Sequence, residues 1–187
     1  MKKFFFAMMC LLAAATFVGC SSETSVTTET KVSVSTDELQ DLLDKGDKNF
    51  DAGKYDDAIK NFTDAIKIDD ECAAAYNGRG MAYGMKKDFD AAIKDFDQTI
   101  KLEPQNPEGY SNRGKAYFDK GDNQKALADF NKAIEIDPKY SNSYNNRGAL
   151  YFHSGETEKA IADFKKAVEL DPNNKQAAEN LKAATAN

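Results

Sequence analysis

The chain repeats itself at intervals of 34 residues, and this period limits its possible folds more than any other feature. The clearest copy spans 107–140 and reads PEGYSNRGKAYFDKGDNQKALADFNKAIEIDPKY. A fixed period of roughly 20–50 residues indicates a stacked array, in which each unit buries its apolar face against its neighbours. The matching residues of three successive copies are Gly80, Gly114 and Gly148; Tyr83, Tyr117 and Tyr151; Ala92, Ala126 and Ala160; Phe96, Phe130 and Phe164; Pro104, Pro138 and Pro172.

Each copy is predicted to form two short amphipathic helices joined by a turn. In 107–140, apolar and small residues recur at helical spacing on both sides of Gly121. Gly121 is predicted to end the first helix in the left-handed conformation, and Asp122 to cap the second. All four prolines lie at unit boundaries, where they interrupt no helix. The period therefore predicts four units, at 39–72, 73–106, 107–140 and 141–174, followed by a capping helix at about 175–186.

This pattern resembles the tetratricopeptide repeat. The resemblance rests on an aromatic residue at unit position 4, Gly at 8, Tyr at 11, Ala at 20, Phe at 24 and Pro at 32. At position 7 the chain departs from the family, because Arg79, Arg113 and Arg147 replace the usual Leu. The first unit departs most, with Asn49 at position 11. The resemblance implies an all-α, right-handed α-solenoid over residues 37–187.

The same resemblance implies where a partner would bind. In this family the inner faces of the first helices line a concave groove that holds a peptide or a helix. Asn side chains can hydrogen-bond to a peptide backbone, and Phe and Met provide adaptable apolar contacts. The implied function is therefore that of a non-catalytic adaptor or scaffold for protein–protein interaction. The candidate groove residues are Asn77, Met81, Ser111, Asn112, Lys115, Phe118, Asn145, Asn146, Phe152 and His153.

One specific activity of the family is predicted to be absent. Some members grip the C-terminal carboxylate of chaperones with a fixed set of Lys, Asn and Arg side chains. Only Asn112 matches that set, so we expect no binding of chaperone tails. When the comparison starts from the first unit, the corresponding positions hold Leu43, Asp47, Gly78, Glu108 and Asn112. When it starts from the second unit, they hold Asn77, Met81, Asn112, Asn142 and Asn146.

The N-terminus is predicted to be a targeting segment. Lys2 and Lys3 precede an apolar run that ends at Val18, as in a signal peptide spanning 1–19. The letters FVGC that close this segment resemble a bacterial lipobox. The resemblance implies cleavage before Cys20 and attachment of lipid to its sulfur. Two or three acyl chains there would anchor the protein stably to a membrane.

The residues after the lipobox bear on the tether and on the location. The segment 20–36 is rich in Ser and Thr, which predicts a flexible tether between membrane and domain. Ser21 occupies the position at which enteric bacteria use Asp to retain lipoproteins in the inner membrane. We therefore expect a lipid-anchored protein of the bacterial cell envelope, at the outer membrane.

Charge and composition exclude several other functions. The net charge of −6 leaves no basic surface for nucleic acid or for anionic lipid headgroups. His153 is the only histidine, so neither a His-based catalytic triad nor a His-rich metal site is expected, and no cofactor. With Cys10 in the signal peptide and Cys20 lipidated, no disulfide framework is predicted. Cys72 is interpreted as a small, buried, apolar residue.

Two alternatives to the adaptor remain open. The chain could be a homo-oligomeric structural subunit, in which the groove accepts part of another copy. It could also be a small enzyme, or a protein that binds a cell-wall ligand, with His153, Lys115 and Tyr151 around the site. Paired carboxylates on helix faces do not indicate catalysis here, since acidic residues are spread along the whole chain. The favoured hypothesis is the non-enzymatic adaptor.

Overall fold

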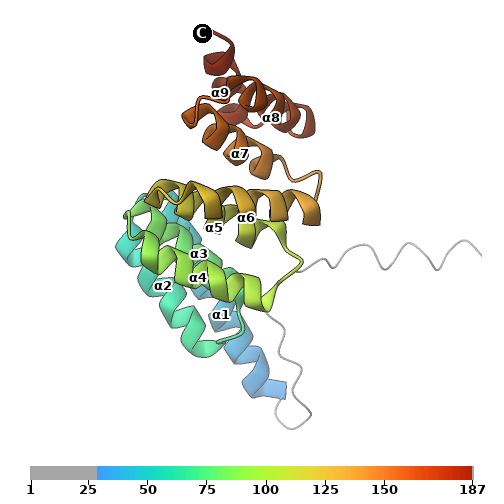
Figure 1. Ribbon diagram of the computed structural model, residues 1–187. Helices are drawn as coiled ribbons and strands as arrows, with labels where there is room; N and C mark the ends of the chain where they lie inside the picture. The colour runs from blue at the N-terminus through green and yellow to red at the C-terminus, as the bar shows by residue number, and fades with distance from the viewer. Residues whose placement is uncertain (1–28, 187) are drawn as a thin grey trace, which may run out of the picture.

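The computed structural model describes the backbone of residues 29–186 and the side chains of residues 36–186 (Figure 1). Within this part of the chain every regular element is an α-helix. The helices are α1 (Glu29–Asp51), α2 (Tyr55–Ile68), α3 (Ala73–Met85), α4 (Phe89–Leu102), α5 (Pro107–Lys120), α6 (Asn123–Ile136), α7 (Ser141–His153), α8 (Thr157–Leu170) and α9 (Lys175–Thr185).

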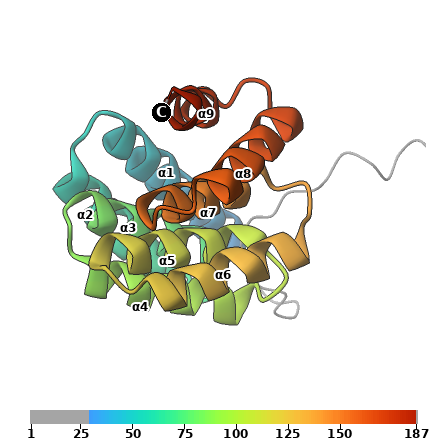
Figure 2. The same ribbon diagram turned by 45° about the horizontal axis from the view of Figure 1, so that its top comes forward.

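The helices alternate between two layers. α1, α3, α5, α7 and α9 contact one another in succession, whereas α2, α4, α6 and α8 make no such contacts among themselves within the described region. The first set therefore lies closer together and forms the concave side. We call these the inner helices and the others the outer helices. Figure 2 shows α4 and α6 along one side of the molecule and α9 on the opposite side. The arrangement confirms the predicted all-α solenoid with a final capping helix.

The core between the layers depends on one phenylalanine of each outer helix. Phe62, Phe130 and Phe164 are the largest fully buried side chains of the described region. A Cβ atom added to Gly114 would lie 2.7 Å from Cε1 of Phe130 and 3.2 Å from the backbone oxygen of Ala126. Only glycine lets the ring pack this closely against the inner helix. Burial of one such ring stabilises the fold by about 1.5–3 kcal/mol.

The turn inside each unit follows the predicted chemistry. Gly121 adopts a φ of 94° and ends α5, and its backbone N–H donates to the backbone oxygen of Phe118 at 2.9 Å. The carboxylate of Asp122 accepts a hydrogen bond from the backbone N–H of Lys125 at 3.2 Å, which caps α6. Both predictions are confirmed. In the second unit the same left-handed site is occupied by Lys87, with a φ of 64°.

The first helix is longer than predicted. Residues 29–36 form the N-terminal turns of α1, so the prediction of a flexible tether is wrong for this segment. A helix that is already nucleated gains a hydrogen bond for each added residue, and Ser, Thr or Val cost at most about 0.7 kcal/mol relative to Ala. Composition alone does not reveal this extension. Residues 1–28, with the predicted signal peptide, Cys20 and the rest of the tether, lie outside the described residues.

Cys72 is fully buried where α3 begins, next to Leu39, Ala65 and Ala75. It forms a disulfide bond, which corrects the prediction that the chain has none. Pairing depends on how closely two sulfur atoms approach in the fold, and the spacing of cysteines along the chain does not show this. The other two cysteines lie outside the described residues.

Candidate functional site: the concave groove

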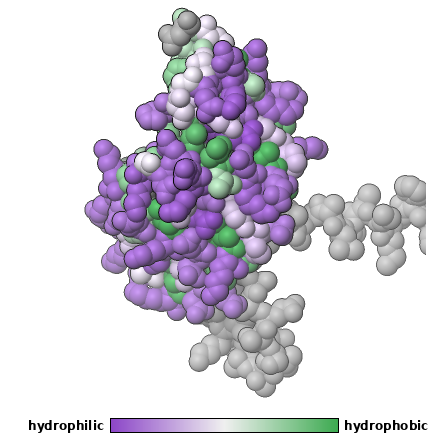
Figure 3. All heavy atoms as spheres, viewed as in Figure 1, coloured by the Kyte–Doolittle hydropathy of each residue, from purple (hydrophilic) through white to green (hydrophobic). Residues whose placement is uncertain are grey.

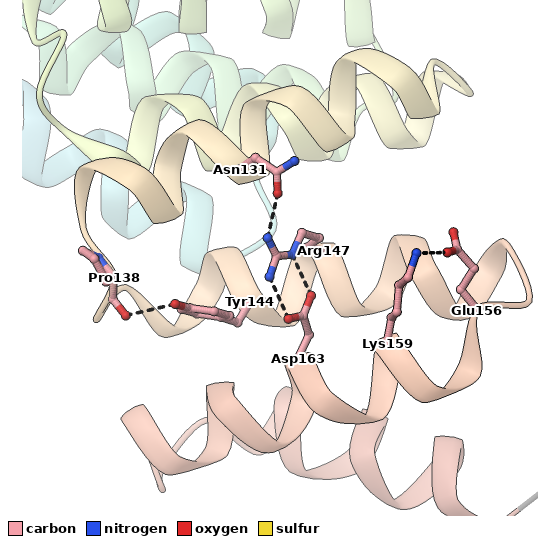
Figure 4. Close-up of polar contacts among 7 residues, drawn as sticks. All are labelled: Asn131, Pro138, Tyr144, Arg147, Glu156, Lys159 and Asp163. Atoms are coloured by element: carbon pink, nitrogen blue, oxygen red, sulfur yellow. Dashed lines mark hydrogen bonds and ion pairs between the residues drawn. The ribbon is translucent and has the colours of Figure 1, made fainter.

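Some polar side chains hold the scaffold and are not free to bind a partner. Arg147 of α7 is an example (Figure 4). Its Nε and Nη2 atoms donate to the carboxylate of Asp163 at 2.7 and 2.8 Å, and its Nη1 donates to Oδ1 of Asn131 at 2.6 Å. The guanidinium also lies over the ring of Tyr144, 5.6 Å from its centroid. Hydrogen bonding to Asp163 raises the pKa of Arg147 above its ordinary value.

The same contacts recur at each arginine of unit position 7. Each guanidinium joins an inner helix to the outer helix of its own unit and to the outer helix of the preceding unit. This arrangement explains why Arg stands where the family usually has Leu. These arginines therefore belong to the scaffold. The other two sets are Arg113 with Asp129 and Asp97, and Arg79 with Asp95 and Thr63.

A second periodic contact, which we call the amide ladder, joins the inner helices to one another. In each rung an Asn at unit position 6 donates through Nδ2 to the residue at position 5 of the preceding unit. The spacing of 35 residues in every rung follows from the repeat. The rungs are Asn112 to Asn77 at 2.9 Å, Asn146 to Ser111 at 3.2 Å, and Asn180 to Asn145 at 2.9 Å.

The ladder corrects part of the predicted groove. Ser111 is 1% exposed and Asn145 is 8% exposed, so a partner cannot reach either side chain. Their oxygen atoms accept hydrogen bonds from the next inner helix. Asn112 and Asn146 are half-buried and donate within the ladder, but each keeps a carbonyl oxygen that accepts no hydrogen bond from the described residues. These two Asn residues can therefore still accept a hydrogen bond from a partner.

Three predicted residues meet in a cavity of about 500 Å³ at the C-terminal end of the groove. Phe118 of α5 and His153 of α7 stack edge to face, with ring centroids 5.6 Å apart. Phe152 is 37% exposed and lies beside them. Asn180 of α9 and Phe164 of α8 complete much of the wall. We call this the aromatic cavity. Its volume lies in the range of pockets that enclose small molecules or a large side chain.

A second cavity, of about 510 Å³, lies at the other end of the groove among α1, α3, α4 and α5. We call it the acidic cavity, since it is lined by Asp47, Glu103 and Glu108 together with Asn77 and Met81. Asn77 donates to Oε1 of Glu108 at 2.9 Å. Asp47 stays exposed to solvent; partial desolvation raises its pKa, and the neighbouring carboxylates of α1, Asp51 and Asp44, raise it further.

The remaining predicted residue, Lys115, lines neither cavity. It is exposed on α5 and forms an ion pair with Asp119 one turn later on the same helix. Lys115 is the only basic candidate of the groove, and this pair neutralises its charge.

Sequence reasoning missed several lining residues. Asp47 and Glu108 were compared only with the chaperone-binding pattern, and Glu103 belongs to the end of an outer helix. Asn180 could have been found, since it lies 34 residues after Asn146 and continues the register. α9 therefore lines the aromatic cavity as well as capping the array.

The rest of the described region offers few other sites. In the view of Figure 3 the surface is mostly hydrophilic, with hydrophobic residues in small separate areas. Within residues 29–186, no group of three His, Cys, Asp or Glu side chains is placed to hold a metal ion. No helix in the same range is long and apolar enough to cross a membrane.

Comparison with known proteins agrees with this geometry. Family models described as tetratricopeptide repeats match residues 43–107, 114–155 and 141–174. The structure of TTC0263, a thermophilic TPR protein in Thermus thermophilus, is similar with a TM-score of 0.74 and 23% identity. The match covers 79% of this chain and 81% of that one. At this identity the likeness shows the fold alone.

Two further structures are more similar in sequence. The MamA protein is 26% identical, with a TM-score of 0.61, over 75% of this chain and 82% of that one. The first TPR of Spaghetti (RPAP3), solved with the HSP90 peptide SRMEEVD, is 30% identical. Its TM-score is 0.56, and the match covers 61% of this chain and 90% of that one.

The stacked helix pairs and the groove on their inner side define an α-solenoid of the class that serves protein–protein interaction. The chain belongs to the tetratricopeptide repeat family. Members of this family generally act as non-enzymatic adaptors, and the fold of this chain indicates a role in protein–protein interaction.

Proposed function

We propose that this protein is a membrane-anchored adaptor of a bacterial cell envelope, which holds a segment of a protein partner in its concave groove. The observation that carries the proposal is the aromatic cavity. Phe118, Phe152 and His153 come from two successive inner helices and leave an apolar recess open on the binding side. Burial of a partner's apolar side chain there would provide about 1.5–3 kcal/mol.

Crosslinking in cells tests the groove. A photo-crosslinking amino acid replaces Phe152 in one variant and Ile68, which is 36% exposed on outer helix α2, in a control variant. Adducts with a discrete partner are expected at residue 152 and not at residue 68. Equal crosslinking at both positions, or none at residue 152, would contradict binding in the groove.

The anchor is proposed from the sequence and is tested separately. The mature N-terminal peptide should carry lipid on Cys20, and Cys20→Ser should move the protein from the outer-membrane fraction into the soluble fraction. A sulfur atom that carries lipid cannot also form a disulfide bond. Mass spectrometry of that peptide therefore decides between lipid and a disulfide at Cys20. A disulfide at Cys20, or unchanged membrane association of the Ser variant, would reject the lipid anchor.

A further inference from the structure

The groove has two ends of different chemistry, and α5 connects them. Glu108, in the first turn of α5, lines the acidic cavity, and Phe118, near its last turn, lines the aromatic cavity. Ten residues of α-helix span about 15 Å at a rise of about 1.5 Å per residue. A partner that fills both cavities therefore needs two recognised groups roughly this far apart.

The acidic end carries charge that the protein does not neutralise. Within the described residues, the ion pairs of Lys and Arg involve other carboxylates, such as Asp90 and Asp129, and none reaches Asp47, Glu103 or Glu108. Glu103 and Glu108 accept hydrogen bonds only from neutral Asn side chains. This end of the groove is thus complementary to a cation.

A row of carboxylates on α1 adds to the negative charge at the acidic cavity. Asp44, Asp47 and Asp51 recur at helical spacing on one face. Desolvation raises the pKa of Asp47, and the nearby carboxylates of Asp51 and Asp44 raise it further. A positive charge bound among them would relieve this repulsion.

The amide ladder favours an extended segment between the two ends. The carbonyl oxygens of Asn112 and Asn146 point to no donor among the described residues. An extended peptide has backbone N–H groups that can donate to them. The N–H groups of a helix are already used in its own hydrogen bonds.

Building on the proposed function, we propose that the bound segment is extended and basic, with a large apolar side chain about five residues from an Arg or Lys. The basic residue lies in the acidic cavity and the apolar one in the aromatic cavity. About five residues of extended chain, at about 3.3 Å each, cover the distance between the cavities. A second copy of this chain is a poorer occupant, because its net charge of −6 has the same sign as the groove.

The chemistry differs from that of the relative solved with an HSP90 peptide. That peptide, SRMEEVD, carries three acidic residues and one Arg, and its acidic residues lie toward the C-terminal end. The groove here would repel such a peptide at the acidic cavity, in agreement with the prediction that chaperone tails are not bound.

Fluorescence anisotropy with synthetic peptides and the full chain tests the proposal. The probes carry an Arg-Arg pair and a Phe separated by about two, five or nine Ser and Gly residues, with matched probes in which Glu replaces Arg or Ser replaces Phe. Tightest binding is expected at the spacing of about five, with roughly tenfold weaker binding for either matched probe and weakening by salt. Equal binding of the Glu probe, or no dependence on spacing, would overturn the proposal.

Variants of the protein locate the binding. The double change Asp47→Asn with Glu108→Gln keeps the shapes and removes two charges, and Phe152→Ala removes one wall of the aromatic cavity. Each should weaken binding of the best probe by about tenfold. The matched controls Asp57→Asn and Ile68→Ala, both on α2, should leave it unchanged. Equal effects of the control changes would reject this placement.

Failure of the basic-segment inference can be distinguished from failure of the proposed binding in the groove. If crosslinking at residue 152 captures a partner through an acidic segment, or one without an apolar residue, the groove function stands and the basic-segment inference is wrong. If neither residue 152 nor residue 68 forms an adduct with a partner, the groove function itself is wrong.

Discussion

The Nδ2 atom of Asn112 donates to Oδ1 of Asn77 at 2.9 Å and joins α5 to α3. Asn77 in turn donates to Glu108 at the start of α5. A residue that faces the groove therefore also sets how closely successive inner helices approach. For this reason a loss of partner binding in an Asn112 variant would not by itself prove contact with the partner.

We predict that Asn112→Ala lowers the free energy of unfolding by about 1 kcal/mol, because the half-buried amide of Asn77 loses its donor. Asn173→Ala, at an exposed position between α8 and α9, is the control and should change it little. Chemical denaturation followed by circular dichroism measures both. Equal stabilities of the two variants would show that the ladder contributes nothing.

The arginine contacts should behave as a coupled pair. Arg113→Met leaves Asp129, which is 7% exposed, with an uncompensated charge and should cost about 3 kcal/mol. Adding Asp129→Leu should recover most of the loss, because the buried charge is then absent. The control Lys132→Met breaks an exposed ion pair with Glu135 and should have little effect. A double variant no more stable than Arg113→Met would contradict this account.

The contact between Gly114 and Phe130 allows no added atom. Gly114→Ala should destabilise the fold by about 1–3 kcal/mol, since its Cβ would lie 2.7 Å from the ring and the backbone oxygen of Ala126 blocks a shift. Gly84→Ala is the matched control in an inner helix, because the added Cβ atom would have no contact within 4 Å beyond its chain neighbours and the backbone of its own helix. It should be neutral or slightly stabilising. Thermal unfolding of both variants tests the difference.

The turn sites should respond in opposite directions. Lys87 has a φ of 64°, a conformation that costs a residue with a Cβ atom about 1–2 kcal/mol, so Lys87→Gly should stabilise by up to about 1 kcal/mol. Gly121→Ala, at the same unit position with a φ of 94°, should destabilise by about 1 kcal/mol. Changes of the same sign in both variants would be inconsistent with this explanation.

Asp47 should give the protein a pH dependence in the acidic range. Its pKa is raised in the folded protein by burial and by Asp51 and Asp44, so the folded state binds the proton more tightly than the unfolded state. The free energy of unfolding therefore falls as pH rises from the ordinary carboxyl pKa through the raised one, and stays level above it. Asp47→Asn should be more stable at pH 7 by a few tenths of a kcal/mol, with a smaller difference in acid.

The control for this titration is Asp57→Asn, since Asp57 is exposed on α2 and faces no such row of carboxylates. Denaturation midpoints measured from pH 3 to pH 7 give the comparison. An Asp47→Asn difference that grows toward acid would have the wrong sign and would reject the repulsion.

The repeat alone determined the fold, because a face of Gly, Ala and Phe at a period of 34 residues has to be buried against the next unit. It also predicted the turn at Gly121 and Asp122, where the requirements are local. These features depend on residues that are near in sequence or related by the period.

The tertiary structure decided which groove residues a partner can reach. Asn145 and Asn146 are adjacent in sequence, yet one is buried in the amide ladder and the other is half-buried, with a carbonyl oxygen that accepts no hydrogen bond from the described residues. The hydrogen bonds of the amide ladder depend on the angle between successive inner helices. A local sequence pattern does not predict this angle. The two cavities likewise combine side chains from several units, and their charge and volume follow from how the units curve around them.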